Sequence, residues 1–320
     1  MRLTSARPSE IDAVSSTRGL YGAAVVGRLH DDEVDIDEEI VRGLLAAQAP
    51  HLAEGPLERV ASSGTDNAMY RLGDELVVRL PVHEPSVKAL VRERRWLPVL
   101  APLLPLAVPE VVFAGEAGER FPFPWSVHRW LDGTEATHAP PVDRHAAAEA
   151  IAGFVHALEA IDPHGGPRSF RSESLRDRDP FVRRSIGLVA DEYDPSWLTA
   201  EWDAALALAD RAEPPTWIHA DLHAGNLLTT DGRISAVIDF GSAGLGDPAV
   251  ELIAAWDPLL DGARATYRSA LGFDDATWAR GRGWAFSAAV NALGYYRNTN
   301  PAMGVRARFT LDELRAEPSS

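Results

Sequence analysis

Three polar residues in the second half of the chain have the chemistry of a metal-dependent phosphate site. Asp221 and Asn226 lie in the segment HADLHAGN, and Asp239 follows a short apolar run. Carboxylate and amide oxygens are the hard ligands that Mg²⁺ prefers when it also binds water and phosphates. Phosphoryl transfer further needs a carboxylate that orients the attacking hydroxyl and accepts its proton. These residue types therefore suit phosphoryl transfer.

A β-hairpin is predicted to bring the three side chains together. Asp-Gly at 231–232 separates two short apolar runs, which is a strong hairpin signal. One polar loop precedes the first strand and the other follows the second, so both loops lie at one end of the hairpin. A single loop Asp or Asn is usually a turn or cap residue, but the joint pattern favours a common site.

This part of the chain resembles the aminoglycoside phosphotransferase family, whose fold is protein-kinase-like. The resemblance rests on HADLHAGN at 219–226, IDFG at 238–241 and GDP at 246–248. It implies that Asp221 is the catalytic base, and that Asn226 and Asp239 bind Mg²⁺ as the kinase catalytic loop and Asp-Phe-Gly triplet do. Ala220 stands where the family commonly has glycine, which we interpret as a mild change.

The resemblance also implies an ATP site in the first half of the chain, with GTP left open. A loop between strands predicted at 57–62 and 68–72 would cover the phosphates, although its single glycine also fits a plain turn. The backbone connecting the two lobes would bind the adenine. The residues expected to contact the nucleotide are Ser63, Gly64, Thr65 and Asn67 in the loop and His128, Arg129 and Trp130 in the connection.

An ion pair is predicted beside the nucleotide. Alternation along a strand at 76–80 puts Arg79 on the face opposite the leucines. Glu93 lies on the leucine stripe of a helix predicted at 86–101, where a charge needs a partner. The kinase plan pairs a basic strand residue with a helix glutamate. Arg79 and Glu93 are therefore the expected pair, and both belong to the predicted nucleotide site.

Composition disfavours several other classes of function. The chain has 320 residues, a net charge of −16 and no cysteine. The negative charge disfavours nucleic acid and anionic membrane as partners, and the absence of cysteine excludes disulfides and thiolate metal sites. Prolines interrupt the most apolar stretch, which disfavours a membrane span. We expect a cytoplasmic monomer or homodimer whose partner is a small-molecule acceptor.

The predicted fold class is α+β, with two lobes as in protein kinases. Residues 1–35 are interpreted as a mobile extension, 36–131 as the nucleotide-binding N-lobe with an antiparallel sheet and a helix, and 132–320 as a larger, mainly helical C-lobe. A continuous helix is expected over 249–260. Asp247, directly before a proline, is predicted to cap that helix.

The acceptor is expected to be cationic and hydroxylated, such as an aminoglycoside or a related amino sugar. The net negative charge of the chain supports this expectation. Asp257 and Asp261 support it too, because they are predicted on helices beside the catalytic loop. A macrolide or another hydroxylated metabolite is the alternative acceptor. A metal-dependent hydrolase using His219, Asp221 and His223 would need further histidines at suitable spacing. A non-catalytic kinase-like binding protein would not need to keep all three polar residues.

Overall fold

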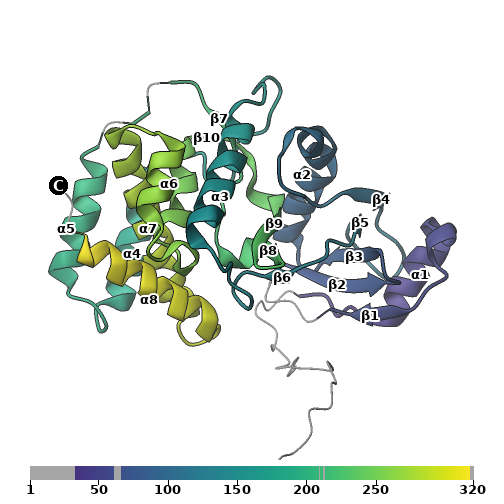
Figure 1. Cartoon of the computed structure of the whole chain (residues 1–320). Helices are drawn as coiled ribbons and strands as arrows, with labels where there is room; N and C mark the ends of the chain where they lie inside the picture. The colour runs from purple at the N-terminus through teal and green to yellow at the C-terminus, as the bar shows by residue number, and fades with distance from the viewer. Residues whose placement is uncertain (1–32, 61–65, 209, 212, 318–320) are drawn as a thin grey trace, which may run out of the picture.

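A computed structural model describes residues 33–60, 66–208, 210–211 and 213–317. One lobe contains a five-stranded antiparallel sheet with two helices, and the other is mainly helical (Figure 1). The predicted α+β combination is confirmed. Most of the predicted N-terminal extension lies outside the described residues.

The N-lobe sheet has the strand order β1-β2-β3-β5-β4. Its strands are β1 (Leu57–Arg59), β2 (Asn67–Leu72), β3 (Leu76–Pro81), β4 (Val111–Gly115) and β5 (Trp125–Arg129). Arg79 is paired with Met69 on one side and Ser126 on the other, and Val77 is paired with His128. Directly paired residues project from the same face. The sheet therefore has one face that carries Asn67, Arg79 and His128.

The two N-lobe helices cover different parts of the sheet. Helix α1 (Glu38–Gln48) contributes Val41 and Leu45 to an apolar cluster formed with the opposite face of the sheet. Helix α2 (Glu84–Leu100) contacts β3, β4 and β5. It buries the stripe that the sequence predicted, including Glu93. The helix begins two residues before the predicted start, because His83 caps it by accepting the N–H of Ser86.

The predicted hairpin forms between β8 (Leu227–Thr230) and β9 (Arg233–Val237). Asp231 and Gly232 have φ angles of 51° and 72°. Positive φ at both central residues is what a type I′ turn requires, which explains the Asp-Gly pair. Strand β6 (Thr134–Glu135) extends this small sheet beside β8. The hairpin thus lies between the N-lobe and the helices of the C-lobe (Figure 1).

The C-lobe core is built mainly from helices. The helices are α3 (Arg144–Glu159), α4 (Asp179–Val189), α5 (Pro195–Leu206), α6 (Arg264–Leu271), α7 (Asp275–Tyr296) and α8 (Pro301–Ala316). Helices α4, α5 and α8 pack against α7, and α3 packs against α6. The continuous helix predicted over 249–260 is wrong: the chain forms two 3₁₀ segments, Pro248–Trp256 and Pro258–Leu260. Pro258 lacks the N–H that a continuous helix needs. Among the described residues, no helix combines the length and apolarity of a membrane span.

Candidate active site

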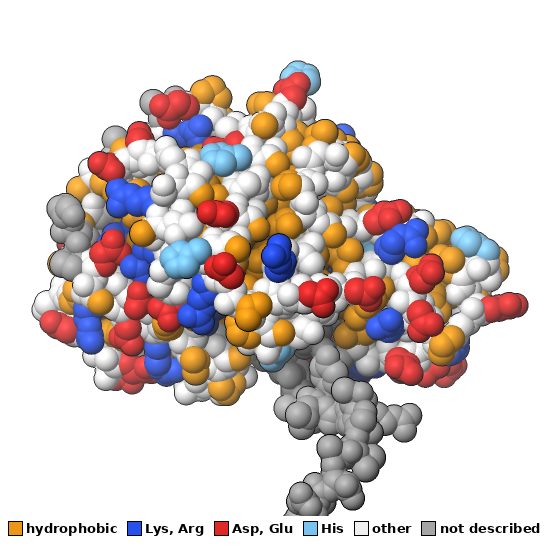
Figure 2. Space-filling view, in the orientation of Figure 1, with side chains coloured by type: hydrophobic (Ala, Val, Ile, Leu, Met, Phe, Trp, Pro, Cys, Tyr) orange, Lys and Arg blue, Asp and Glu red, His pale blue; other side chains and the backbone are white. Residues whose placement is uncertain are grey.

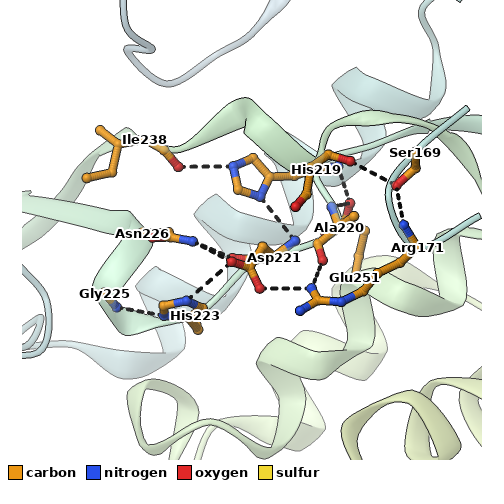
Figure 3. Close-up of polar contacts among 11 residues, drawn as sticks. Ser169, Arg171, His219, Ala220, Asp221, His223, Gly225, Asn226, Ile238 and Glu251 are labelled. Carbon is orange, nitrogen blue, oxygen red and sulfur yellow. Dashed lines mark hydrogen bonds and ion pairs between the residues drawn. The ribbon is translucent and has the colours of Figure 1, made fainter. Parts of the chain in front are cut away.

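The loops before and after the hairpin meet as predicted. Asn226 Nδ2 donates to the backbone carbonyl of Asp221 at 2.9 Å and to its Oδ2 at 3.1 Å. The N–H of Ile238 donates to the carbonyl of Asn226 at 2.9 Å. Figure 3 shows the resulting network around Asp221. Asp239 directly follows Ile238, so these bonds bring the loops that carry the three predicted residues together.

Asp221 is held as a carboxylate by two neighbouring side chains. Arg171 Nη1 lies 2.8 Å from its Oδ1, and His223 Nε2 lies 3.6 Å from its Oδ2. Burial opposes ionisation of Asp221, but the charges of Arg171 and His223 outweigh it and hold its pKa well below the usual value. A carboxylate with so low a pKa is a weak base. Such a carboxylate can orient a hydroxyl group and receive its proton while the hydroxyl oxygen bonds to phosphorus.

His219 has a structural position between the two loops. Its Nε2 lies 3.0 Å from the carbonyl of Ile238, and its Nδ1 accepts the N–H of Asp221 at 3.3 Å. Burial lowers the pKa of His219 to about 4, so the ring is neutral. Both ring nitrogens are engaged, which argues against a hydrolase metal site here. Across the described ranges, no group of three or more His, Cys, Asp or Glu side chains could hold a metal ion.

The predicted ion pair between Arg79 and Glu93 is confirmed, while its contact with a nucleotide stays a prediction. Arg79 Nη1 lies 2.8 Å from Glu93 Oε2, and the Glu93 side chain is 1% exposed. The other oxygen, Oε1, accepts the N–H of Phe240 at 2.9 Å. Glu93 therefore connects the basic strand residue to the loop that carries Asp239.

The N-lobe face above Asp239 carries polar atoms that suit a bound nucleotide. Asn67 Oδ1, Arg79 Nε and His128 Nδ1 are buried and have no hydrogen-bond partner. Burial, and then the charge of Arg79, hold the pKa of His128 well below its usual value. Buried polar groups are normally satisfied, so these three atoms mark a place where a ligand would supply partners.

Two N–H groups at the connection between the lobes are already bonded within the N-lobe, and the predicted adenine contact through other backbone atoms of His128, Arg129 and Trp130 stays a prediction. The N–H of Arg129 donates to the carbonyl of Glu110 at 2.9 Å, and the N–H of Trp130 donates to that of Glu75 at 2.6 Å. Arg71 covers the Trp130 ring at 4.3 Å. Neither N–H is available to an adenine, because the backbone at the end of the sheet uses both. The predicted phosphate-loop residues Ser63, Gly64 and Thr65 lie outside the described residues.

Asn226 and Asp239 fit a divalent cation. Because Asn226 uses its Nδ2 to bind Asp221, its Oδ1 remains as an acceptor. Asp239 remains accessible from the solvent. Desolvation by the surrounding protein, followed by the charge of Glu93, raises the pKa of Asp239 to about 7. Carboxylates crowded in this way favour a bound cation, and an amide and a carboxylate oxygen suit Mg²⁺.

The structure argues against Asp257 as an acceptor-binding residue. Its side chain is buried, and its Oδ1 accepts the N–H groups of Ala224 at 3.3 Å and Leu259 at 3.0 Å. Through the bond to Ala224, Asp257 supports the loop that carries Asp221 and Asn226. Asp261 is about half exposed and lies 3.4 Å from Arg144 Nη1, so its predicted contact with an acceptor stays a prediction.

Two residues in contact with the catalytic loop had no local sequence signal. Arg171 lies fifty positions from Asp221, in an irregular segment between α3 and α4. Glu251 lies in the 3₁₀ segment and accepts the N–H groups of His219 and Ala220. Their roles depend on tertiary contacts, and neither spacing nor periodicity marks them.

The antiparallel N-lobe sheet, the helical C-lobe and the two loops at the hairpin together define a protein-kinase-like fold. A model of the phosphotransferase enzyme family, APH, matches residues 58–284, and the chain belongs to this family.

Individual relatives agree with this assignment. Hygromycin-B 4-O-kinase of Escherichia coli is 27% identical over 223 residues, which cover 55% of this chain and 65% of the relative, just under two thirds of its length. A GDP complex of a mutant aminoglycoside 2′-phosphotransferase-IIIa has a TM-score of 0.71 at 19% identity, covering 88% of this chain and 98% of that one. Macrolide 2′-phosphotransferase MphH from Brachybacterium faecium has a TM-score of 0.54 at 24% identity, covering 88% and 98%. The two structures share the fold of this chain.

Proposed function

We propose that the protein is an ATP-dependent phosphotransferase that moves the γ-phosphate to a hydroxyl of a small molecule. The observation that carries this is that the loops of Asp221, Asn226 and Asp239 meet at one end of the hairpin, where Glu93 joins the Asp239 loop to Arg79. Family membership supports the same reaction.

Each group has a defined part in the proposed reaction. Asp221 accepts a hydrogen bond from the acceptor hydroxyl and takes its proton as that oxygen bonds to the γ-phosphorus and the bond to ADP breaks. Arg79, held by Glu93, contacts the phosphates. Asn226 and Asp239 would hold Mg²⁺, which neutralises charge on the phosphate oxygens.

The proposed acceptor is a cationic hydroxylated molecule, an aminoglycoside or related amino sugar. The net charge of −16 favours cations, and the likeness to a hygromycin-B kinase and to an aminoglycoside phosphotransferase supports the same class. Acidic and basic side chains are interspersed on the face shown in Figure 2, so the charge is not concentrated there.

A macrolide is the second candidate acceptor. The likeness to a macrolide 2′-phosphotransferase supports it, since that structure covers 88% of this chain. Both acceptor classes present a hydroxyl to be phosphorylated, so the site chemistry described above serves either one.

A phosphorylation screen tests the proposal. Aminoglycosides, macrolides, amino sugars and a neutral polyol are incubated with γ-labelled ATP and Mg²⁺, with Asp221→Asn as the blank. Transfer of label to an amino sugar or aminoglycoside supports the proposal. Preference for a macrolide moves the assignment to the second candidate, and label on the neutral polyol alone contradicts a cationic acceptor.

A further inference from the structure

Ala220 has a backbone conformation that a residue with a side chain rarely adopts. Its φ angle is 70°, and the residue is fully buried. The left-handed region disfavours alanine because Cβ approaches a carbonyl oxygen, whereas glycine enters it freely. The alanine is therefore not the mild change expected from the sequence. Its conformation also fixes the direction in which the next residue, Asp221, leaves the loop.

Glu251 holds the amide side of this alanine. Its Oε1 accepts the N–H of Ala220 at 3.0 Å and also the N–H of the preceding His219. Glu251 is 1% exposed, and its Oε2 has no hydrogen-bond partner. The interaction therefore takes place without competing water, and a single buried oxygen fixes two consecutive N–H groups.

Arg171 holds the carbonyl side. Its Nη1 donates to the carbonyl of Ala220 and, at 2.8 Å, to Oδ1 of Asp221 (Figure 3). One nitrogen atom thus contacts both the left-handed alanine and the proposed catalytic base. A guanidinium is rigid and always charged, so it suits a group that fixes a carboxylate.

Residues 167–171, called the strap, deliver Arg171 to this position. The strap runs beside the segment that follows Asp239: the N–H of Ser169 donates to the carbonyl of Leu245 at 3.0 Å, and that of Phe170 to the carbonyl of Ser242 at 3.1 Å. A Cβ at Gly244 would lie 2.6 Å from the Ser169 nitrogen. Glycine there is what allows the strap to approach so closely.

We propose that Arg171 is a positioning residue for Asp221, and that Arg171 and Glu251 form a clamp that holds Ala220 in its left-handed conformation. The inference rests on the proposed function, in which Asp221 receives the acceptor proton. A loosened clamp would let the alanine relax and the carboxylate move. A small displacement of a reacting group lowers turnover more than it lowers substrate binding.

The experiment compares Arg171→Ala in the natural background with Arg171→Ala in an Ala220→Gly background. The single variant should lose about 10- to 100-fold in kcat, with nucleotide KM changed by less than about 3-fold. Glycine adopts the left-handed conformation without the clamp. Relative to Ala220→Gly alone, the loss caused by Arg171→Ala should therefore be at least about 5-fold smaller.

Two comparisons separate positioning from general damage. Arg168→Ala removes a neighbouring arginine of the strap, whose side chain bonds to Ser172 and, among the described residues, to no part of the Asp221 loop, and it should leave kcat within about 2-fold of the wild type. Glu251→Gln keeps an oxygen acceptor and should retain most of the activity. Glu251→Ala should lose it in the same manner as Arg171→Ala.

The proposal is overturned if Arg171→Ala behaves like Arg168→Ala, if its loss is the same in both backgrounds, or if the loss appears only in nucleotide KM. Thermal unfolding of the same proteins without substrate tests the clamp separately from the chemistry. The destabilisation caused by Arg171→Ala should be smaller in the Ala220→Gly background. If Asp221→Asn turns over like the wild type while this stability coupling is observed, the proposed function fails and the clamp stands.

Discussion

Glu93 connects Arg79 to the loop of Asp239 through two different carboxylate oxygens. Oε2 lies 2.8 Å from Arg79 Nη1, and Oε1 accepts the N–H of Phe240 at 2.9 Å. The Glu93 side chain is 1% exposed, so water does not replace either bond. Because Glu93 belongs to α2, a movement of this helix would displace the proposed phosphate and metal contacts together.

The Arg79–Glu93 pair should act as a unit in nucleotide binding. Removing either partner leaves the other charge buried without compensation. A double-mutant cycle with Arg79→Ala and Glu93→Ala should give a coupling of about 1 kcal/mol or more in nucleotide affinity. The Arg94–Glu116 pair on the same helix, whose glutamate side chain is 76% exposed, is the control, with an expected coupling near zero. If the losses of nucleotide affinity caused by Arg79→Ala and Glu93→Ala are additive, the two residues do not act as a unit.

Asp239 should be required for Mg²⁺-dependent nucleotide binding. Asp239→Ala removes the carboxylate proposed to hold the cation, so calorimetry should detect no gain in ATP affinity when Mg²⁺ is added. Asp231→Asn is the control, because it changes an aspartate at the opposite end of the hairpin and asparagine tolerates a positive φ angle. Unchanged Mg-ATP affinity in Asp239→Ala would mean that the cation binds elsewhere.

Glu251 should make the protein less stable as the pH rises. Burial raises its pKa from 4.5 to about 7, so folding favours the protonated form. The stability gained in this way is present below pH 4.5 and is lost as the pH rises through about 7. Glu251→Gln keeps the acceptor oxygen without titrating. Its free energy of unfolding should therefore increase relative to wild type between about pH 5 and pH 8.

Chemical denaturation across this range measures the difference. Glu149→Gln, which changes an exposed glutamate on α3, is the control. If the free energies of unfolding of Glu251→Gln and wild type differ by the same amount at every pH, Glu251 has the same pKa in the folded and unfolded states, which would contradict the prediction.

Substitution of Asp257 should lower stability, whereas substitution of Asp261 should weaken acceptor binding. Asp257→Ala leaves two backbone N–H groups without their acceptor and should lower the free energy of unfolding by about 1–3 kcal/mol, measured by chemical denaturation.

Asp261→Ala should raise the acceptor KM, and the wild-type acceptor KM should rise with ionic strength because exposed charges are screened. An acceptor KM that responds to neither Asp261→Ala nor salt would contradict a contact between Asp261 and a cationic acceptor.

The residues that the sequence predicted share short-range patterns. Asp221, Asn226 and Asp239 flank one hairpin, and the Asp-Gly turn fixes how its ends meet. Arg79 and Glu93 could be paired because strand alternation and the helix stripe each define one face, and the kinase plan joins those faces.

The sequence could not reveal contacts made by irregular segments. Arg171 reaches Asp221 across fifty positions, because the strap is bonded to the segment 242–245 far along the chain. Asp257 did have a local signal: like Asp247, it precedes a proline and accepts the N–H two residues on, at 3.0 Å in both cases. The same Asp-Pro pattern therefore predicts a cap role for both residues.

Asp221→Asn in a single-turnover assay with γ-labelled ATP tests the central claim most directly. Asparagine keeps the size of the side chain and an oxygen acceptor but cannot take the proton. Phosphoryl transfer should slow by about 10²-fold or more, while Mg-ATP affinity measured on the same protein stays close to wild type. Transfer at the wild-type rate would contradict Asp221 as the catalytic base.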